Sequence, residues 1–237
     1  MISLLTISEI EIEVERKKIK NMHLAVYPPD ARVHLSMPDY LTDDDAKAFI
    51  IQKWEWVRKQ REEVLAQPRQ TERQYVSGES HFLFGKRYEL LVEELPHYSN
   101  VIQMKGKKIY MLVKPDTTTE QRATIMREWY RAQLKNQLAT TIKRWAEKLG
   151  ETNYDWQVKQ MKTEWGSCVK SKRMLIFNLE LARVPIEYLE FVVVHEFCHF
   201  VIDSHNKLFE ALMTKRLPNW RTLRKQLNDF IALPYKE

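Results

Sequence analysis

The segment VVVHEFCHFVIDSH, residues 192–205, holds three of the seven histidines of the chain together with a glutamate. His195 and His199 are four residues apart, so on a helix both side chains leave the same face and their ring nitrogens can meet at one ion. Glu196 lies beside that face, where its carboxylate can reach a water molecule, and Phe197 lies opposite, where it can pack into a core. Because zinc accepts this geometry readily, the spacing predicts a zinc site on a helix.

His205 is a third candidate ligand, six residues past His199. On a continued helix its side chain would point about 240° away from the other two histidines. Asp203 and Ser204 are turn and capping residues, so we predict that the first helix ends there and that a second begins near Asn206. Such a bend would return His205 to the metal. Three neutral histidines would leave the fourth position of zinc for water, as a catalytic site requires.

Two carboxylates, Glu210 and Asp229, compete with His205 for the third ligand position. Glu210 is expected on the next helix, where it fits better as a carboxylate that orients a ligand imidazole. The alternative to a metal site as a whole is an ordinary amphipathic helix. We favour the metal site, because unpaired imidazoles and a carboxylate on so apolar a helix would be costly without an ion.

The composition is that of a folded protein with a sizeable core. The chain has 237 residues, of which 44% are hydrophobic and 30% charged, and its net charge of +6 permits nucleic acid or acidic partners without demanding them. It has only two cysteines and no secretory signal at its start, so we expect a cytoplasmic protein with reduced thiols. No apolar run approaches the roughly 20 residues that span a bilayer, so we expect no membrane insertion.

Residues 1–115 are expected to form a strand-rich N-terminal region with one helix. Alternating apolar residues predict three strands in hairpins between residues 10 and 37. A helix should follow the N-cap Thr42 and run to about Ala66, and further hairpins should turn near glycines 85 and 106.

Residues 116–237 are expected to form the second part, after a boundary near Pro115. Apolar residues recur at helical spacing from residue 120 to 149, and Gly150 should end this long helix. The expected elements that follow are strands around 156–164 and 174–181, the helix that Pro185 opens, a helix from about Asn206 and a last helix after Pro218.

The sequence resembles the YgjP-like zinc metallopeptidases, a family related to the SprT-type and other short zincins. The motifs that carry the resemblance are MKTEWGSC at 161–168, FNLELARVPIEYLEFVVVHEFCH at 177–199, HNKLF at 205–209 and LPNWRTLRKQL at 217–227, with a looser match of FLFGKRYEL at 82–90. The resemblance implies an α+β fold, in which the strand-rich part precedes a zincin-like core with a long backing helix, a small sheet and the HExxH helix below the edge of that sheet. It implies zinc ligands at His195, His199 and His205 and a catalytic glutamate at Glu196.

Two positions depart from the patterns of related families. Cys198 stands where this family commonly has a small alanine, so it is either a buried substitute, which we favour, or a thiolate ligand. Ile202 stands where metzincins with the same histidine spacing keep a glycine, and no Met-turn is evident. This weighs against the metzincins proper.

We therefore predict a zinc-dependent peptidase that acts on peptides or proteins, in which Glu196 takes the proton of the attacking water. By resemblance, an extended substrate would pair with the edge strand around KTEWGSC. Trp165 and Ser167 could shape the cleft, although core packing and a turn explain them equally well. The alternatives are a SprT-like protease that acts on nucleic-acid-bound proteins and a noncatalytic interaction module that zinc stabilises.

Overall fold

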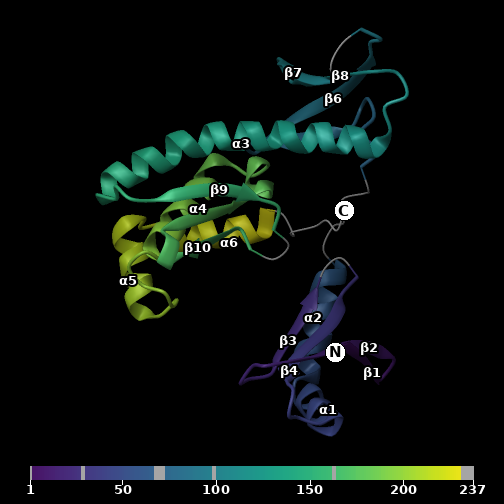
Figure 1. The fold of residues 1–237 in the computed structure, drawn as a ribbon, viewed down its shortest axis with the longest axis vertical. Helices are drawn as coiled ribbons and strands as arrows, with labels where there is room; N and C mark the ends of the chain where they lie inside the picture. The colour runs from purple at the N-terminus through teal and green to yellow at the C-terminus, as the bar shows by residue number, and fades with distance from the viewer. Residues whose placement is uncertain (1, 28–29, 67–72, 98–99, 162–163, 231–237) are drawn as a thin grey trace. The chain divides into compact units, whose positions relative to one another are not determined.

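A computed structural model describes residues 2–27, 30–66, 73–97, 100–161 and 164–230 (Figure 1). Two compact units divide the chain near residue 72. Unit 1 takes the residues up to Thr71, and unit 2 runs from Glu72 to Ile231. Within the described ranges, no helix has the length and apolar character needed to cross a membrane. The expected α+β class is confirmed, because helices and largely antiparallel sheets occur in both units.

Unit 1 contains a four-stranded sheet in the order β1-β2-β4-β3. Its strands are β1 (Ile2–Ile7), β2 (Ile10–Lys17), β3 (His23–Tyr27) and β4 (Arg32–Pro38). The prediction of three strands in hairpins was wrong in two respects. β1 adds a fourth strand, and β2 pairs in parallel with β4 rather than forming a hairpin with β3. The parallel register aligns Ile12 with Val33 and Val14 with Leu35, which places these four side chains in the core of unit 1.

Two helices follow this sheet where one was expected. α1 (Asp43–Gln52) begins after Thr42, whose hydroxyl accepts a hydrogen bond from the backbone of Asp45 while the Asp45 carboxylate bonds back to Thr42. The helix is interrupted at Lys53, and α2 (Trp54–Ala66) begins directly after it. Ile50 of α1 and Val57 of α2 both belong to the core cluster of unit 1.

Unit 2 begins with a second four-stranded sheet, in the order β5-β6-β8-β7. The strands are β5 (Ser80–Leu83), β6 (Lys86–Glu94), β7 (Val101–Lys105) and β8 (Lys108–Val113). Both expected hairpins are confirmed, with turns at Gly85 and Gly106 that have positive φ. The two hairpins join through the parallel pair β6 and β8.

The long helix α3 (Thr119–Leu149) connects the two sheets of unit 2. Thr118 caps its start, and Gly150 ends it in the left-handed conformation at φ 73°, as expected. α3 contacts β7 as well as β9 (Asp155–Lys159), and Figure 1 shows it running past both sheets. Its buried side includes Tyr130, Leu134, Leu138 and Trp145, so it serves as the expected backing helix.

A small three-stranded sheet and three helices complete unit 2. The sheet has the order β10-β11-β9, with β10 (Gly166–Val169) at one edge and β11 (Met174–Asn178) in the middle. The helices are α4 (Ile186–Cys198), α5 (Lys207–Arg216) and α6 (Trp220–Phe230). α4 contacts β10, α3, α5 and α6, so it lies at the centre of this part of the molecule.

The division into units differs from the expected boundary near Pro115. Buried residues of β6 and β8, among them Leu90 and Met111, belong to the same hydrophobic cluster as Tyr130 of α3 and Phe197 of α4. The second sheet therefore shares one core with the elements that carry the HExxH motif. A separate cluster forms the core of unit 1.

Candidate metal centre

Helix α4 carries the HExxH motif, and its start is held by the turn between β5 and β6. The backbone N–H groups of Phe84 and Gly85 donate to the carbonyls of Ala182 and Arg183, at 2.8 and 3.0 Å. Gly85 packs so closely on Pro185 that a β-carbon there would lie 2.7 Å from Pro185 Cγ. The hairpin thereby fixes the point at which α4 begins.

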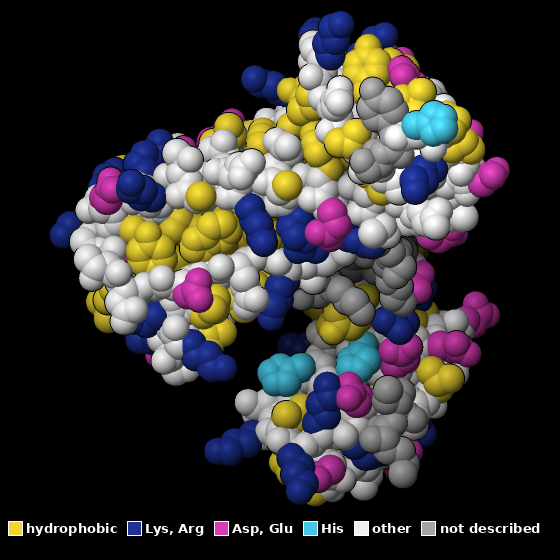
Figure 2. All heavy atoms as spheres, turned by 45° about the horizontal axis from the view of Figure 1, so that its top comes forward, with side chains coloured by type: hydrophobic (Ala, Val, Ile, Leu, Met, Phe, Trp, Pro, Cys, Tyr) yellow, Lys and Arg dark blue, Asp and Glu magenta, His cyan; other side chains and the backbone are white. Residues whose placement is uncertain are grey.

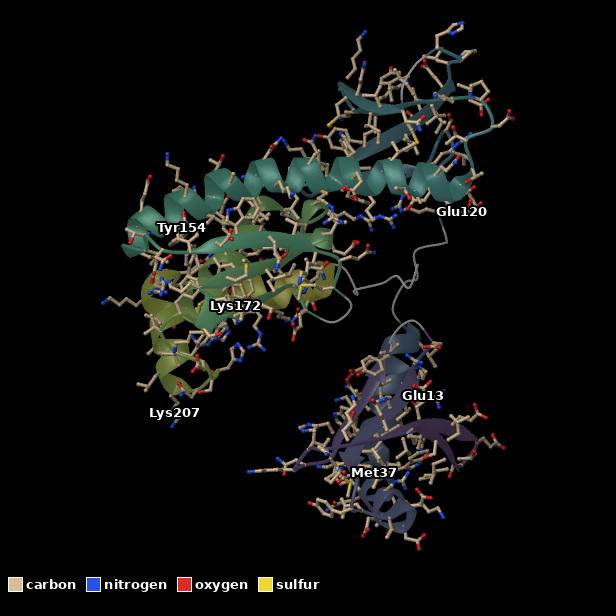
Figure 3. The ribbon with its side chains drawn as sticks, in the orientation of Figure 1. Glu13, Met37, Glu120, Tyr154, Lys172 and Lys207 are labelled. Carbon is tan, nitrogen blue, oxygen red and sulfur yellow. The ribbon has the colours of Figure 1, made fainter. Side chains whose placement is uncertain are left out.

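The predicted bend before α5 is present, although α4 ends earlier than the turn residues Asp203 and Ser204 predicted. The helix ends at Cys198, with His199 as its C-cap, and α5 begins after Asn206, whose side chain accepts hydrogen bonds from the backbone of Leu208 and Phe209 at 3.0 Å. Lys170, just after β10, forms an exposed ion pair with the bend, in which its ammonium group lies 3.1 Å from Asp203 Oδ1. Figure 3 labels Lys172 in the segment after β10 and Lys207 at the start of α5.

The bend brings the three predicted ligands together. Nε2 of His195 lies 3.2 Å from Nε2 of His199 and 3.0 Å from Nε2 of His205, and one ring nitrogen of each lies within 4.8 Å of those of the other two. Nitrogens bound tetrahedrally at about 2.0–2.1 Å from one zinc ion would stand about 3.4 Å apart. The donor set therefore fits a single metal ion.

The ring of Phe209 on α5 packs against all three imidazoles. Its ring centre lies 5.0 Å from that of His195, 4.7 Å from that of His199 and 4.8 Å from that of His205. The side chain is 1% exposed. Packing also has to hold the ring of His195, since its Nδ1 is buried without a hydrogen-bond partner among the described atoms.

The surroundings of the three imidazoles suit metal binding. Burial is the main cause that lowers the pKa of His195 to about 3, and it also lowers the pKa of His205. The carbonyl oxygen of Ile202 lies 3.0 Å from Nδ1 of His199, so it can accept a hydrogen bond from Nδ1–H, which leaves the lone pair of Nε2 facing the other two rings. Neutral imidazoles are the form that ligates metals.

Glu196 lies against the edge strand β10. It is 3% exposed, and a β-carbon at Gly166 would lie 2.5 Å from Glu196 Oε1 and 2.9 Å from Val192 Cγ1. Burial raises the pKa of Glu196 to about 8, and the nearby Glu164 adds to the shift. A divalent cation close to this carboxylate would counter the shift and favour its charged form.

A cleft of about 500 Å³ joins these groups. Its floor is α4, with His195, His199 and Glu196. β10 and the residues before it form one wall, from Glu164 to Cys168, so Trp165 and Ser167 both line the cleft. Asn178, which is fully buried, holds this wall in place by donating to the carbonyls of Met161 and Glu164 at 3.0 and 2.7 Å.

The YgjP-like metallopeptidase domain matches residues 20–230 of this sequence. The chain belongs to the YgjP-like metallopeptidase family. No curated protein matches it in sequence. A crystal structure of the metallopeptidase zymogen abylysin of Pyrococcus abyssi is similar over 42% of this chain and 99% of that chain, with 10% identity and a TM-score of 0.38. The zymogen jannalysin of Methanocaldococcus jannaschii is similar over 40% and 91%, with 16% identity and a TM-score of 0.37.

The other candidate metal ligands of this YgjP-like metallopeptidase do not join the cluster of three histidines. Glu210 is exposed on α5 and pairs with Arg221 at 2.7 Å, and Asp229 is exposed near the end of α6. Both cysteines are free. Cys198 is buried with its Sγ 3.3 Å from Sδ of Met213, and burial raises the pKa of its thiol. Burial also raises the pKa of Cys168, which lines the cleft, to about 11.

Several residues of the YgjP-like site were not predicted from the sequence. Gly166 is one of only five glycines in the chain and is the first residue of β10, and a glycine in a strand can mark the close approach of another group. Phe209 and Lys170 gave no such signal, because an aromatic residue on a helix and a lysine after a strand are common. Arg224 and Asn228 of α6 also line the cleft, far from the motif in sequence.

Proposed function

We propose that this YgjP-like metallopeptidase is a zinc-dependent peptidase, in which His195, His199 and His205 hold the metal and Glu196 is the general base. The observation that carries the proposal is the convergence of three Nε2 atoms on the floor of a cleft that also contains a buried glutamate. A bound zinc ion supplies a Lewis acid that lowers the pKa of a water molecule to about 7 and polarises the substrate carbonyl.

The protein groups provide the proton transfers and the position of the substrate. Glu196 takes a proton from the attacking water and passes it to the nitrogen of the leaving amine. β10 has one neighbour, β11, among the described strands, so an extended peptide can add to its other edge. Gly166 lets that strand approach the carboxylate of Glu196 closely. The substrate is therefore expected to be an extended segment of a peptide or unfolded protein.

The two alternative functions have less support. A module that zinc only stabilises has no need of a buried carboxylate beside its ligands, because burial of Glu196 costs free energy. For a protease of nucleic-acid-bound proteins, a continuous basic surface would be favourable. On the face shown in Figure 2, the Lys and Arg side chains are dispersed among acidic ones.

The variant Glu196→Gln tests the proposal. We expect wild-type protein to contain about one zinc per chain and to cleave unfolded casein, and the variant to keep its zinc but lose the cleavage. Glu210→Gln is the matched control, since Glu210 is an exposed glutamate outside the cleft. A parallel assay on a DNA-bound protein substrate separates the two protease functions. Joint loss of zinc and cleavage in Glu196→Gln would make Glu196 structural, and zinc-loaded wild type without cleavage would contradict a peptidase.

A further inference from the structure

The α6 side of the cleft carries two polar side chains whose purpose the proposed function leaves open. Arg224 and Asn228 are four residues apart on α6, so they share one face of the helix, and both line the cleft with the histidines. Leu223 and Leu227 are 7% and 1% exposed and attach the adjacent face of α6 to the core. A rigid helix therefore presents Arg224 to the cleft.

Arg224 is an exposed side chain of the cleft that has no ion-pair partner among the described residues. By contrast, Arg221, one turn earlier, pairs with Glu210 at 2.7 Å. Arg224 lines the same cleft as His195 and His205. A free cation beside residues that hold a metal repels that metal. A negatively charged group bound between the two would be attracted to both.

Arg224 and Glu196 reach the cleft from different helices. Glu196 contacts the β10 wall at Gly166, whereas Arg224 lines the cleft from α6. A peptide that pairs with β10 points every second carbonyl away from that strand, toward the opposite wall. When water attacks a carbonyl next to Glu196, negative charge develops on the carbonyl oxygen, and a donor on the opposite wall can stabilise it.

We propose that the guanidinium group of Arg224 binds the carbonyl oxygen of the scissile peptide bond and stabilises the negative charge that develops there. This inference rests on the proposed function, and it makes Arg224 a catalytic residue of the same site. Asn228 lies one turn further along the same face, where its amide can hydrogen-bond the substrate beside that carbonyl.

The test compares Arg224→Met and Arg224→Lys with the control Arg221→Met, which alters the same helix outside the cleft. The substrate is a fluorogenic peptide blocked at both ends, so that it offers no terminal carboxylate. We expect Arg224→Met to lower kcat by about 100- to 1000-fold with KM nearly unchanged and zinc content intact. Arg224→Lys should recover part of this loss, because it restores the charge without the planar donor pair. Arg221→Met should behave as wild type.

A second measurement does not depend on turnover. A phosphinic peptide, also blocked at both ends, carries a tetrahedral anion where the substrate has a planar carbonyl, and its Kd for each zinc-loaded variant can be measured by calorimetry. We expect Arg224→Met to weaken this binding by a factor similar to its loss of kcat. Unchanged kcat and unchanged phosphinic-peptide affinity would overturn the proposal. So would a rise in KM confined to peptides with a free C-terminus, which would make Arg224 a carboxylate-binding residue. If wild type cleaves no peptide, the proposed function fails, while the affinity measurement still decides the role of Arg224.

Discussion

The carboxylate of Glu196 lies so close to the backbone of Gly166 that a side chain at position 166 would collide with it. A β-carbon at position 166 would stand 2.5 Å from Glu196 Oε1. Gly166→Ala should therefore push Glu196 away from the cleft without touching any of the three histidines. A misplacement of about 1 Å in a catalytic group can cost about 100-fold in rate. We expect cleavage of unfolded casein to fall by about this factor while the zinc content stays at the wild-type value.

Gly106→Ala is the matched control for this substitution. Gly106 lies in the turn between β7 and β8, where a β-carbon meets nothing within 4 Å. Its positive φ makes the alanine somewhat strained, so this control also reports the effect of a small loss in stability. Equal activity of Gly166→Ala and wild type would show that the position of Glu196 does not depend on this contact.

The third metal ligand can be assigned by comparing three single variants. His205→Ala should lower the zinc affinity by orders of magnitude, because it removes one of the three converging nitrogens. Glu210→Ala and Asp229→Ala should keep the metal, since both side chains are exposed outside the cleft. Competition with a chelator of known affinity measures each constant. Weak zinc binding in Glu210→Ala together with wild-type binding in His205→Ala would reverse the assignment.

The sequence predicted the helices of unit 2 well, because their signals are local. Thr118 and Gly150 mark both ends of α3, and Asn206 marks the start of α5 after the predicted bend. Strand pairing was harder, since β2 pairs with β4 across an intervening strand and no local signal reports this. Lys53 interrupts a helical pattern without a proline or glycine.

The candidate site likewise combines local features, which the sequence predicted, with contacts between distant segments, which it did not. The spacing of the HExxH motif and the turn residues before His205 are local, so the sequence alone predicted three histidines near one point. The contact between Gly166 and Glu196 and the place of Arg224 depend on how β10 and α6 pack against α4. Such packing depends on pairings between distant segments, which composition and periodicity do not determine.

Truncation tests where the catalytic core begins. A chain that starts at residue 73 keeps β5–β8, whose residues share a cluster with α3 and α4. We expect it to unfold cooperatively and to bind zinc. A chain that starts at residue 116, at the boundary expected from sequence, loses the turn that packs on Pro185 and leaves the buried side of α3 exposed. We expect aggregation and weak zinc binding. Circular dichroism and metal analysis read both outcomes, and a well-folded shorter chain would support the boundary near Pro115.

A buried histidine outside the metal centre predicts how stability depends on pH. His81 of β5 is fully buried, with Nδ1 3.4 Å from the hydroxyl of Tyr130 and Nε2 3.4 Å from a carboxylate oxygen of Glu79. Burial is the main cause that lowers its pKa from 6.5 to about 3, and the charges of Arg73 and Arg183 add to this. These effects outweigh the attraction of Glu79, because the geometry gives no hydrogen bond between Glu79 and Nε2.

His81→Gln should therefore make the free energy of unfolding less dependent on pH. Between pH 6.5 and about 3 the unfolded chain binds a proton at His81 that the folded chain does not, so the stability that neutral His81 gives is complete above pH 6.5 and is lost as pH falls. The loss amounts to about 1.4 kcal/mol for each pH unit. The free energy of unfolding is measured with urea between pH 7.5 and 4 on chelator-treated protein. The difference between wild type and His81→Gln should change with pH by this slope. His97→Gln, at an exposed histidine, should show no such difference from wild type. Parallel curves for wild type and His81→Gln would mean that His81 is protonated in the folded protein, with Glu79 as its partner.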